Sequence, residues 1–135
     1  MTEDTTTRLF VYGTLMPGFG NYARIEHLVR YAQPASTEGV LIDLGAFPAM
    51  IPGQGRVNGV LLELDEEALT ITDCIEGHDP DADRNLYDRK KAVIRLADGE
   101  EVAAWVYEFA NPDAIANYSH AVVESSGDVP VYEWP

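Results

Sequence analysis

The chain has 135 residues, of which 46% are hydrophobic, and this is the size and composition of one globular domain with a buried core. Its 23 acidic and 9 basic residues give a formal net charge of −14, and such a surface repels nucleic-acid phosphates and anionic lipids. We therefore expect a single domain over residues 1–135, with a flexible tail over residues 1–7 and no nucleic-acid or membrane partner.

The cellular compartment is indicated by the only cysteine and by the N-terminal residues. Cys74 has no second cysteine with which to form an internal disulfide, which suits a reducing compartment. Residues 1–7 are polar and acidic and lack the basic and apolar pattern of an export signal. We expect a cytoplasmic protein.

The large acidic excess also indicates adaptation to a salty cytoplasm, because salt screens the repulsion among carboxylates. We therefore expect the midpoint of unfolding to rise as KCl is increased from low to molar concentration. A midpoint that does not respond to KCl would contradict this interpretation.

Apolar runs and breakers predict the elements of the first half of the chain. Residues 8–12 form an apolar, aromatic strand that stops at Gly13. Asn21 is expected to cap a short helix on which Glu26 and Arg30 form an ion pair. That helix should cover one side of a sheet.

The middle of the chain predicts two further strands and a helix. Residues 38–44 and 57–64 have strand character, whereas residues 45–55 contain prolines and glycines and are expected to form a loop. Asp65 is expected to cap the following helix, and Gly77 to end it.

The second half predicts a hairpin of residues 86–96 and 101–109, because Asp98-Gly99 is a favoured turn pair. A last strand over residues 129–134 would be interrupted by Pro130. Five or six mostly antiparallel strands and two short helices predict an α+β fold, built on a curled sheet or a small barrel.

Patterns for metal sites and activated nucleophiles are incomplete in this sequence. Asp79, Asp81 and Asp83 resemble the start of a calcium loop, but other residues stand where its glycine and its final glutamate are required. Cys74 and His78 have the spacing of a nucleophile and a base, yet a buried structural cysteine is the favoured interpretation. We expect no metal and no cofactor.

Two local features carry the functional signal. At Tyr12-Gly13-Thr14-Leu15 a strand runs into a glycine turn, which leaves backbone N–H groups available to hold a carboxylate or a phosphate. Glu76 lies at the C-terminal end of a predicted helix, where the helix dipole disfavours an acid by about 0.3–1 kcal/mol. Since helix stability does not explain this acid, we interpret Glu76 as a functional residue.

Several short motifs follow one another along the chain in a specific order. They are Tyr12-Gly13-Thr14-Leu15, Val57-Asn58-Gly59-Val60-Leu61, Asp73 with Glu76-Gly77, Tyr87-Asp88-Arg89, Tyr107 and Ser126-Gly127-Asp128. Over residues 8–128 this set resembles the gamma-glutamylcyclotransferase-like family. The resemblance implies a small mixed, mostly antiparallel β-barrel with short flanking helices and one central cavity.

The resemblance also implies an activity and a set of site residues. A γ-glutamyl small molecule would be the substrate, and its α-amine would attack its own γ-carbonyl to release 5-oxoproline and a free amine or amino acid. Glu76 would be the catalytic acid and base, and we expect it to be partly buried, because burial raises the pKa of a carboxyl group. The residues implied to bind substrate are Tyr12, Gly13, Thr14, Leu15, Tyr87 and Tyr107.

Two other interpretations stay open, because a fold does not fix a function. A non-catalytic module could use the same cavity for a small carboxylate, or its surface for a protein partner, and would show stabilisation by ligand without product. A hydrolase could use Glu76 and Asp73 as paired carboxylates. No sequence feature indicates the oligomeric state.

Overall fold

The structure, a computed structural model, describes residues 6–13, 15–18, 20–43, 48–76, 78, 87–109, 119–120, 124–126 and 129–132. These residues form eight strands, one α-helix and two 3-10 helices. In chain order the elements are β1 (Thr6–Val11), η1 (Gly20–Arg24), η2 (Glu26–Leu28), β2 (Val29–Asp43), β3 (Pro48–Asp65), α1 (Ala68–Glu76), β4 (Tyr87–Leu96), β5 (Glu101–Phe109), β6 (Ser119–His120), β7 (Glu124–Ser126) and β8 (Val129–Tyr132).

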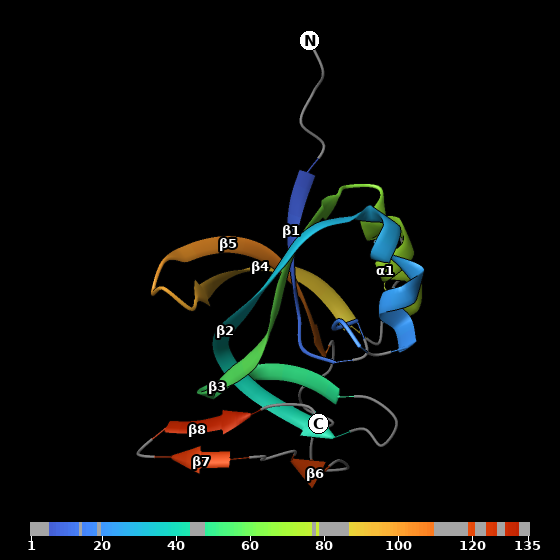
Figure 1. Ribbon diagram of the computed structural model, residues 1–135. Helices are drawn as coiled ribbons and strands as arrows, with labels where there is room; N and C mark the ends of the chain where they lie inside the picture. The colour runs from blue at the N-terminus through green and yellow to red at the C-terminus, as the bar shows by residue number, and fades with distance from the viewer. Residues whose placement is uncertain are drawn as a thin grey trace.

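Five strands close into a barrel (Figure 1). They are hydrogen-bonded in the order β2-β4-β5-β1-β3, and β3 pairs back with β2. β1 is parallel to β5 and β8 is parallel to β3, whereas the other pairs are antiparallel. The predicted mixed, mostly antiparallel barrel is therefore confirmed.

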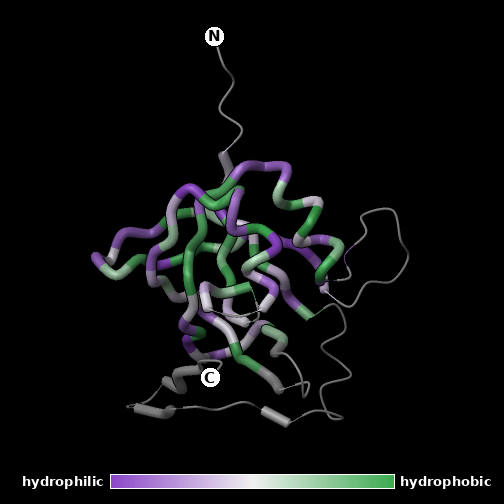
Figure 2. Tube along the Cα trace, turned by 45° about the vertical axis from the view of Figure 1, so that its right-hand side comes forward, coloured by the Kyte–Doolittle hydropathy of each residue, from purple (hydrophilic) through white to green (hydrophobic). Residues whose placement is uncertain are grey.

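Strand alternation divides the buried side chains into two clusters, because successive residues point to opposite faces of a strand. One cluster takes residues from all five barrel strands and fills the barrel, with Phe10, Ala35, Leu61, Ile94 and Val106 among its members. The other lies between the barrel and α1, and includes Leu9, Leu62, Leu64, Ala68, Leu69 and Tyr107. Hydrophobic stretches accordingly run through the barrel strands in Figure 2.

The β4–β5 hairpin confirms the prediction made from Asp98-Gly99. The Leu96 amide donates to the Glu100 carbonyl at 2.8 Å, and the Gly99 amide donates to the Leu96 carbonyl at 3.0 Å. Gly99 has a φ of +90°, a left-handed conformation that glycine adopts without strain. The loop is a three-residue hairpin connection with its glycine in the left-handed position.

The helix predicted after Asn21 is wrong in type and in extent. Two short 3-10 helices, η1 and η2, occupy this region, and Val29 already begins β2. Arg30 hydrogen-bonds Thr6 and Asp65 instead of Glu26, because its place on a strand brings it beside β1 and the end of β3.

The predicted loop over residues 45–55 is wrong for residues 48–55, and residues 45–47 lie outside the described residues. Residues 48–55 belong to β3, since pairing with the long β2 overrides their weak strand propensity. The ladder passes from Glu38↔Arg56 directly to Val40↔Ile51, so residues 52–55 lie in an irregularity. The breakers predicted to end a strand therefore mark a bulge within one.

The end of α1 matches the prediction and its start does not. Asp65 is the last residue of β3 and its carboxylate pairs with Arg30, while the helix begins at Ala68. The helix ends at Glu76, and the His78 amide donates to the Asp73 carbonyl at 2.8 Å, which is the longer bond of a Schellman ending. In the described part of the chain, no helix combines the length and apolar character needed to cross a membrane.

Candidate active site

Glu76 is held at the end of α1 against the barrel. The helix buries Ala68, Leu69 and Thr72, and Glu76 follows Thr72 and Leu69 on the same face at helical spacing. Figure 1 shows α1 on the outside of the barrel, on the same side as η1 and η2. Glu76 is partly buried, as expected, and burial raises the pKa of its carboxyl group from 4.5 to about 7.

Two buried tyrosines lie within electrostatic range of Glu76. Burial, and then the Coulomb effect of Glu76, raise the pKa of Tyr87 at the start of β4. The pKa of Tyr12 is raised by burial first, and then by Tyr87 and Glu76. The structure therefore brings the first residue of the predicted carboxylate-binding loop, the predicted acid and one predicted pocket residue close together.

The loop after β1 is anchored at Tyr12. Its hydroxyl donates to the Tyr107 carbonyl at 2.5 Å and accepts from the Met50 amide at 3.1 Å. The Met16 amide donates to the Gly13 carbonyl at 2.9 Å, which closes a tight turn, and the Leu15 side chain lies in the core.

The backbone donors of this loop can be followed for two of its residues. Within the described residues, the amides of Gly13 and Leu15 donate to no main-chain oxygen. Thr14, also predicted to bind substrate, lies outside the described residues. That these two amides hold an anionic ligand stays a prediction.

Tyr107 connects β5 to α1 through its hydroxyl group. That hydroxyl donates to the Asp73 carboxylate at 2.6 Å, and it lies 2.6 Å from the Thr72 hydroxyl. Arg89 donates to the same carboxylate from Nε at 2.9 Å and from Nη2 at 3.2 Å. Asp73 is thus fully engaged, which disfavours the interpretation of Asp73 and Glu76 as paired hydrolytic carboxylates.

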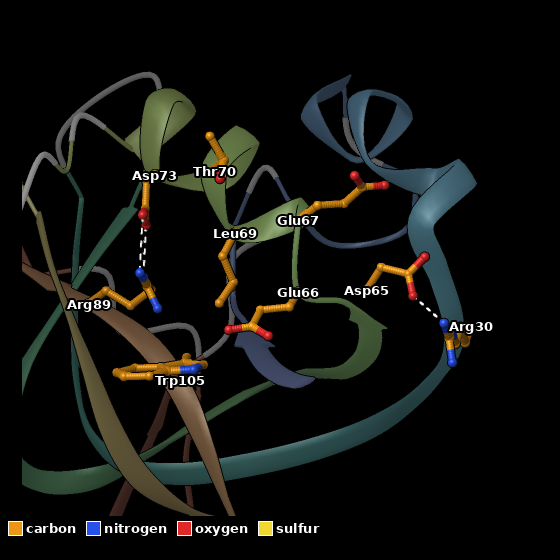
Figure 3. Close-up of a pocket in the computed structure, with 9 residues that line it drawn as sticks. All are labelled: Arg30, Asp65, Glu66, Glu67, Leu69, Thr70, Asp73, Arg89 and Trp105. Atoms are coloured by element: carbon orange, nitrogen blue, oxygen red, sulfur yellow. Dashed lines mark hydrogen bonds and ion pairs between the residues drawn. The ribbon is translucent and has the colours of Figure 1, made fainter. Parts of the chain in front are cut away.

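A pocket of about 720 Å³ lies beside α1 (Figure 3). Two ion pairs, Arg30–Asp65 and Arg89–Asp73, stand on its walls, and Trp105 lies beneath Arg89. The Arg89 guanidinium carbon is 4.5 Å from the centre of the Trp105 ring. Glu76 does not line this pocket, so a cavity shared by Glu76 and the loop at residues 12–15 stays a prediction.

The cysteine prediction is wrong, because Cys74 is exposed. It lies on the side of α1 opposite Leu69 and Thr72, which face the core.

No cluster of three or more potential metal ligands occurs among the described residues, and the aspartates at 79, 81 and 83 lie outside them. His78 Nδ1 is 3.1 Å from the Tyr87 carbonyl oxygen.

The sequence interpretation missed the partners of Tyr107, namely Thr72, Asp73 and Arg89. One signal for this set was present in the hairpin, where Arg89 pairs with Tyr107 and Lys91 with Trp105. Residues opposite one another on antiparallel strands have neighbouring side chains. The exact loop length was needed to obtain that register.

Comparison with known proteins gives consistent results. The profile of the family described as "Gamma-glutamyl cyclotransferase, AIG2-like" matches residues 9–129. A Methanocaldococcus jannaschii protein named "Putative gamma-glutamylcyclotransferase MJ1514" is 31% identical over 127 residues, which cover 92% of this chain and 96% of that one. The "Gamma-L-glutamyl-butirosin B gamma-glutamyl cyclotransferase" of Niallia circulans is 32% identical over 107 residues, covering 78% and 68%.

Solved structures show the same fold. The solution structure of an Arabidopsis thaliana protein has a TM-score of 0.64 at 24% identity, and the match covers 83% of this chain and 76% of that one. A structure named gamma-glutamyl cyclotransferase has a TM-score of 0.56 at 17% identity, covering 85% and 69%.

Proposed function

This chain belongs to the AIG2-like gamma-glutamyl cyclotransferase family, and we propose that it converts a γ-glutamyl amide into 5-oxoproline and a free amine or amino acid. The observation that carries the proposal is the partly buried carboxyl group of Glu76, whose pKa is raised by burial to about 7 and which lies within electrostatic range of Tyr12 at the start of the loop at residues 12–15. A carboxyl group tuned to this pKa can both accept and return a proton near neutral pH.

In the proposed reaction the nucleophile belongs to the substrate. Glu76 accepts a proton from the substrate's α-ammonium group, and the resulting amine attacks the γ-carbonyl carbon. A new C–N bond closes the five-membered ring, and the amide C–N bond to the leaving group breaks. Glu76 returns its proton to the leaving nitrogen as that bond breaks. The ring nitrogen, which still carries two hydrogens, then gives one of them by way of Glu76 to the released amine, so that 5-oxoproline is left as a neutral lactam and the amine leaves as an ammonium ion.

The loop at residues 12–15 is proposed to hold the substrate's α-carboxylate. The Gly13 and Leu15 amides support this role, and Thr14 is retained from the sequence prediction. Holding the carboxylate restricts the substrate to conformers in which the amine can reach the γ-carbonyl, which is an orientation effect. Tyr12, Tyr87 and Tyr107 are proposed as lining residues, with the Tyr107 hydroxyl already bound to α1.

The experiment that tests the function is incubation with a panel of γ-glutamyl compounds, with 5-oxoproline measured by mass spectrometry. One arm contains γ-glutamyl amino acids and the other contains γ-glutamyl derivatives of larger amines, the type of compound named for the Niallia circulans relative. We expect 5-oxoproline from at least one arm. Thermal stabilisation by these compounds without product would instead support the binding module.

The pH dependence of the rate follows from the role of Glu76. Because only the ionised carboxylate accepts a proton, kcat/KM should rise with pH between about 6 and 8, with a midpoint near the Glu76 pKa of about 7. Titration of the Glu76 carboxyl by ¹³C NMR should give the same midpoint and so assign this limb. A rate that is constant from pH 5 to 8 would contradict the role.

A further inference from the structure

Asp73 lies on α1 three residues before Glu76, and its carboxylate has three donors. Tyr107 Oη donates at 2.6 Å, and Arg89 donates from Nε at 2.9 Å and from Nη2 at 3.2 Å. The Asp73 and Arg89 side chains are only 15% and 18% exposed. Little-exposed, bidentate arginine–carboxylate pairs have a defined geometry, unlike pairs at an open surface.

The hydrogen bonds around Tyr107 have one consistent direction. The ionised Asp73 carboxylate can only accept, so the single phenolic proton of Tyr107 is directed to it. The single proton of the Thr72 hydroxyl has two acceptors within reach, the Leu69 carbonyl at 3.2 Å and the Tyr107 hydroxyl at 2.6 Å. Because Tyr107 gives its own proton to Asp73, we assign the Thr72 proton to the shorter contact. The Tyr107 hydroxyl on β5 therefore makes two hydrogen bonds to α1, one with Thr72 and one with Asp73.

The same tyrosine also reaches the loop after β1. The Tyr107 carbonyl accepts the Tyr12 hydroxyl bond at 2.5 Å, so one residue contacts α1 through its side chain and the start of the loop through its main chain. His78 adds two contacts after the helix end, since its amide donates to the Asp73 carbonyl and its ring stands edge-on to Tyr107 with centroids 6.4 Å apart. In the sequence, Glu76 lies between Asp73 and His78, which both contact Tyr107.

We propose that Asp73, clamped by Arg89, is a positioning residue that fixes Glu76 relative to the loop at residues 12–15 through Tyr107. The proposal rests on the proposed function, because it assigns Asp73 a part in the same site. Helix ends fray readily, and a buried carboxylate gains hydration if the helix end moves outward. The bonds from Thr72 and Asp73 to Tyr107 oppose that movement, and a displacement of about 1 Å at a reacting group can lower a rate about 100-fold.

The principal test is Tyr107→Phe, which removes the hydroxyl and keeps both the ring and the carbonyl that accepts from Tyr12. We expect kcat to fall about 10- to 100-fold and KM to change less than about 3-fold, because the loop still holds the substrate's carboxylate. Tyr31→Phe is the matched control, since Tyr31 is 55% exposed, and it should leave both constants unchanged.

A second pair of variants separates this role from the loss of an ion pair. Asp73→Asn and Asp65→Asn each remove a carboxylate paired with an arginine on the wall of the same pocket (Figure 3). Of these two carboxylates, the one bonded to Tyr107 is that of Asp73. We expect Asp73→Asn to lower kcat as Tyr107→Phe does, and Asp65→Asn to keep it.

A readout without turnover distinguishes failure of this proposal from failure of the proposed function. The Glu76 carboxyl, titrated by ¹³C NMR, should show a lower pKa in Tyr107→Phe and Asp73→Asn than in the unmodified protein, because a displaced helix end admits water. That shift would support the positioning role even if no γ-glutamyl compound were turned over. A folded Tyr107→Phe protein with unchanged Glu76 titration and unchanged kcat would overturn it, and this variant decides alone if Asp73→Asn does not fold.

Discussion

Glu76→Gln is expected to abolish 5-oxoproline release and, above neutral pH, to make the protein more stable. Glutamine keeps the shape of the side chain but cannot accept the proton of the substrate's ammonium group. General acid–base catalysis contributes about 10²- to 10⁴-fold to a rate, so the residual activity should fall below one per cent. Mass spectrometry of 5-oxoproline measures this loss.

The gain in stability follows from the pKa of Glu76, which is about 7 in the folded protein against an ordinary value of 4.5. Between these values the folded state binds the proton more tightly than the unfolded state, so the contribution of Glu76 to stability decreases as the pH rises from about 4.5 to about 7. Glutamine, which stays neutral, avoids a penalty of up to about 3 kcal/mol above pH 7. Thermal melts at pH 8 should show a higher Tm for the variant than for the unmodified protein, and melts at pH 4 should show no difference in Tm.

The control for both effects is Glu66→Gln, which makes the same charge change at an exposed position just before α1. It should change the free energy of unfolding by no more than an ordinary surface substitution does, about 0.5 kcal/mol, and so leave Tm nearly unchanged. Substantial turnover by Glu76→Gln would refute the catalytic role, and equal stability of this variant and the unmodified protein at pH 8 would refute the burial of the Glu76 charge.

Gly59→Ala is expected to destabilise the protein strongly, because it adds a methyl group where β3 packs closely against β1. A Cβ at Gly59 would lie 2.2 Å from the Val11 carbonyl oxygen and 2.8 Å from Phe10 Cζ. Phe10 is fully buried and Val11 is held by the β1–β3 ladder, so neither has room to move. Overpacking of this kind costs about 3 kcal/mol or more, which urea denaturation would measure as a lower midpoint.

The matched control is Gly20→Ala, because a Cβ there meets nothing within 4 Å and Gly20 does not have a positive φ. Its unfolding midpoint should stay close to that of the unmodified protein. Since β1 leads directly into the loop at residues 12–15, Gly59→Ala should also raise KM if the variant folds. A Gly59→Ala protein as stable as the Gly20→Ala control would show that β1 and β3 can separate at this point.

Features that depend on neighbouring residues could be predicted from the sequence. The strand predicted over residues 57–64 is confirmed as part of β3, and strand geometry explains why Leu62 and Leu64 lie in one cluster and Leu61 in the other, because successive side chains point to opposite faces. The end of α1 at Glu76 was predictable from Gly77, and the hairpin from Asp98-Gly99. The position of an acid at the wrong end of a helix is likewise a local property.

Features that depend on long-range pairing were decided by the tertiary structure. Residues 48–55 have the composition of a loop, yet they belong to β3 because β3 pairs with β2. Arg30 pairs with Asp65 and not with the predicted Glu26, because β2 and β3 are neighbouring strands. Cys74 was predicted to be buried because cysteine is usually buried, but the packing of Leu69 and Thr72 turned it outward.

In the candidate site, too, the identity of the residues was predictable from the sequence and their arrangement was not. The residues that carry the proposed chemistry, Glu76 and the loop at residues 12–15, could be selected from local sequence and from the order of the motifs. Their arrangement could not, because it depends on a three-residue loop that sets Arg89 opposite Tyr107, and on the docking of α1 that brings Asp73 to the same hydroxyl. A shift of one residue in the hairpin would place Arg89 on the other face, and the loop length and the packed barrel together exclude that shift.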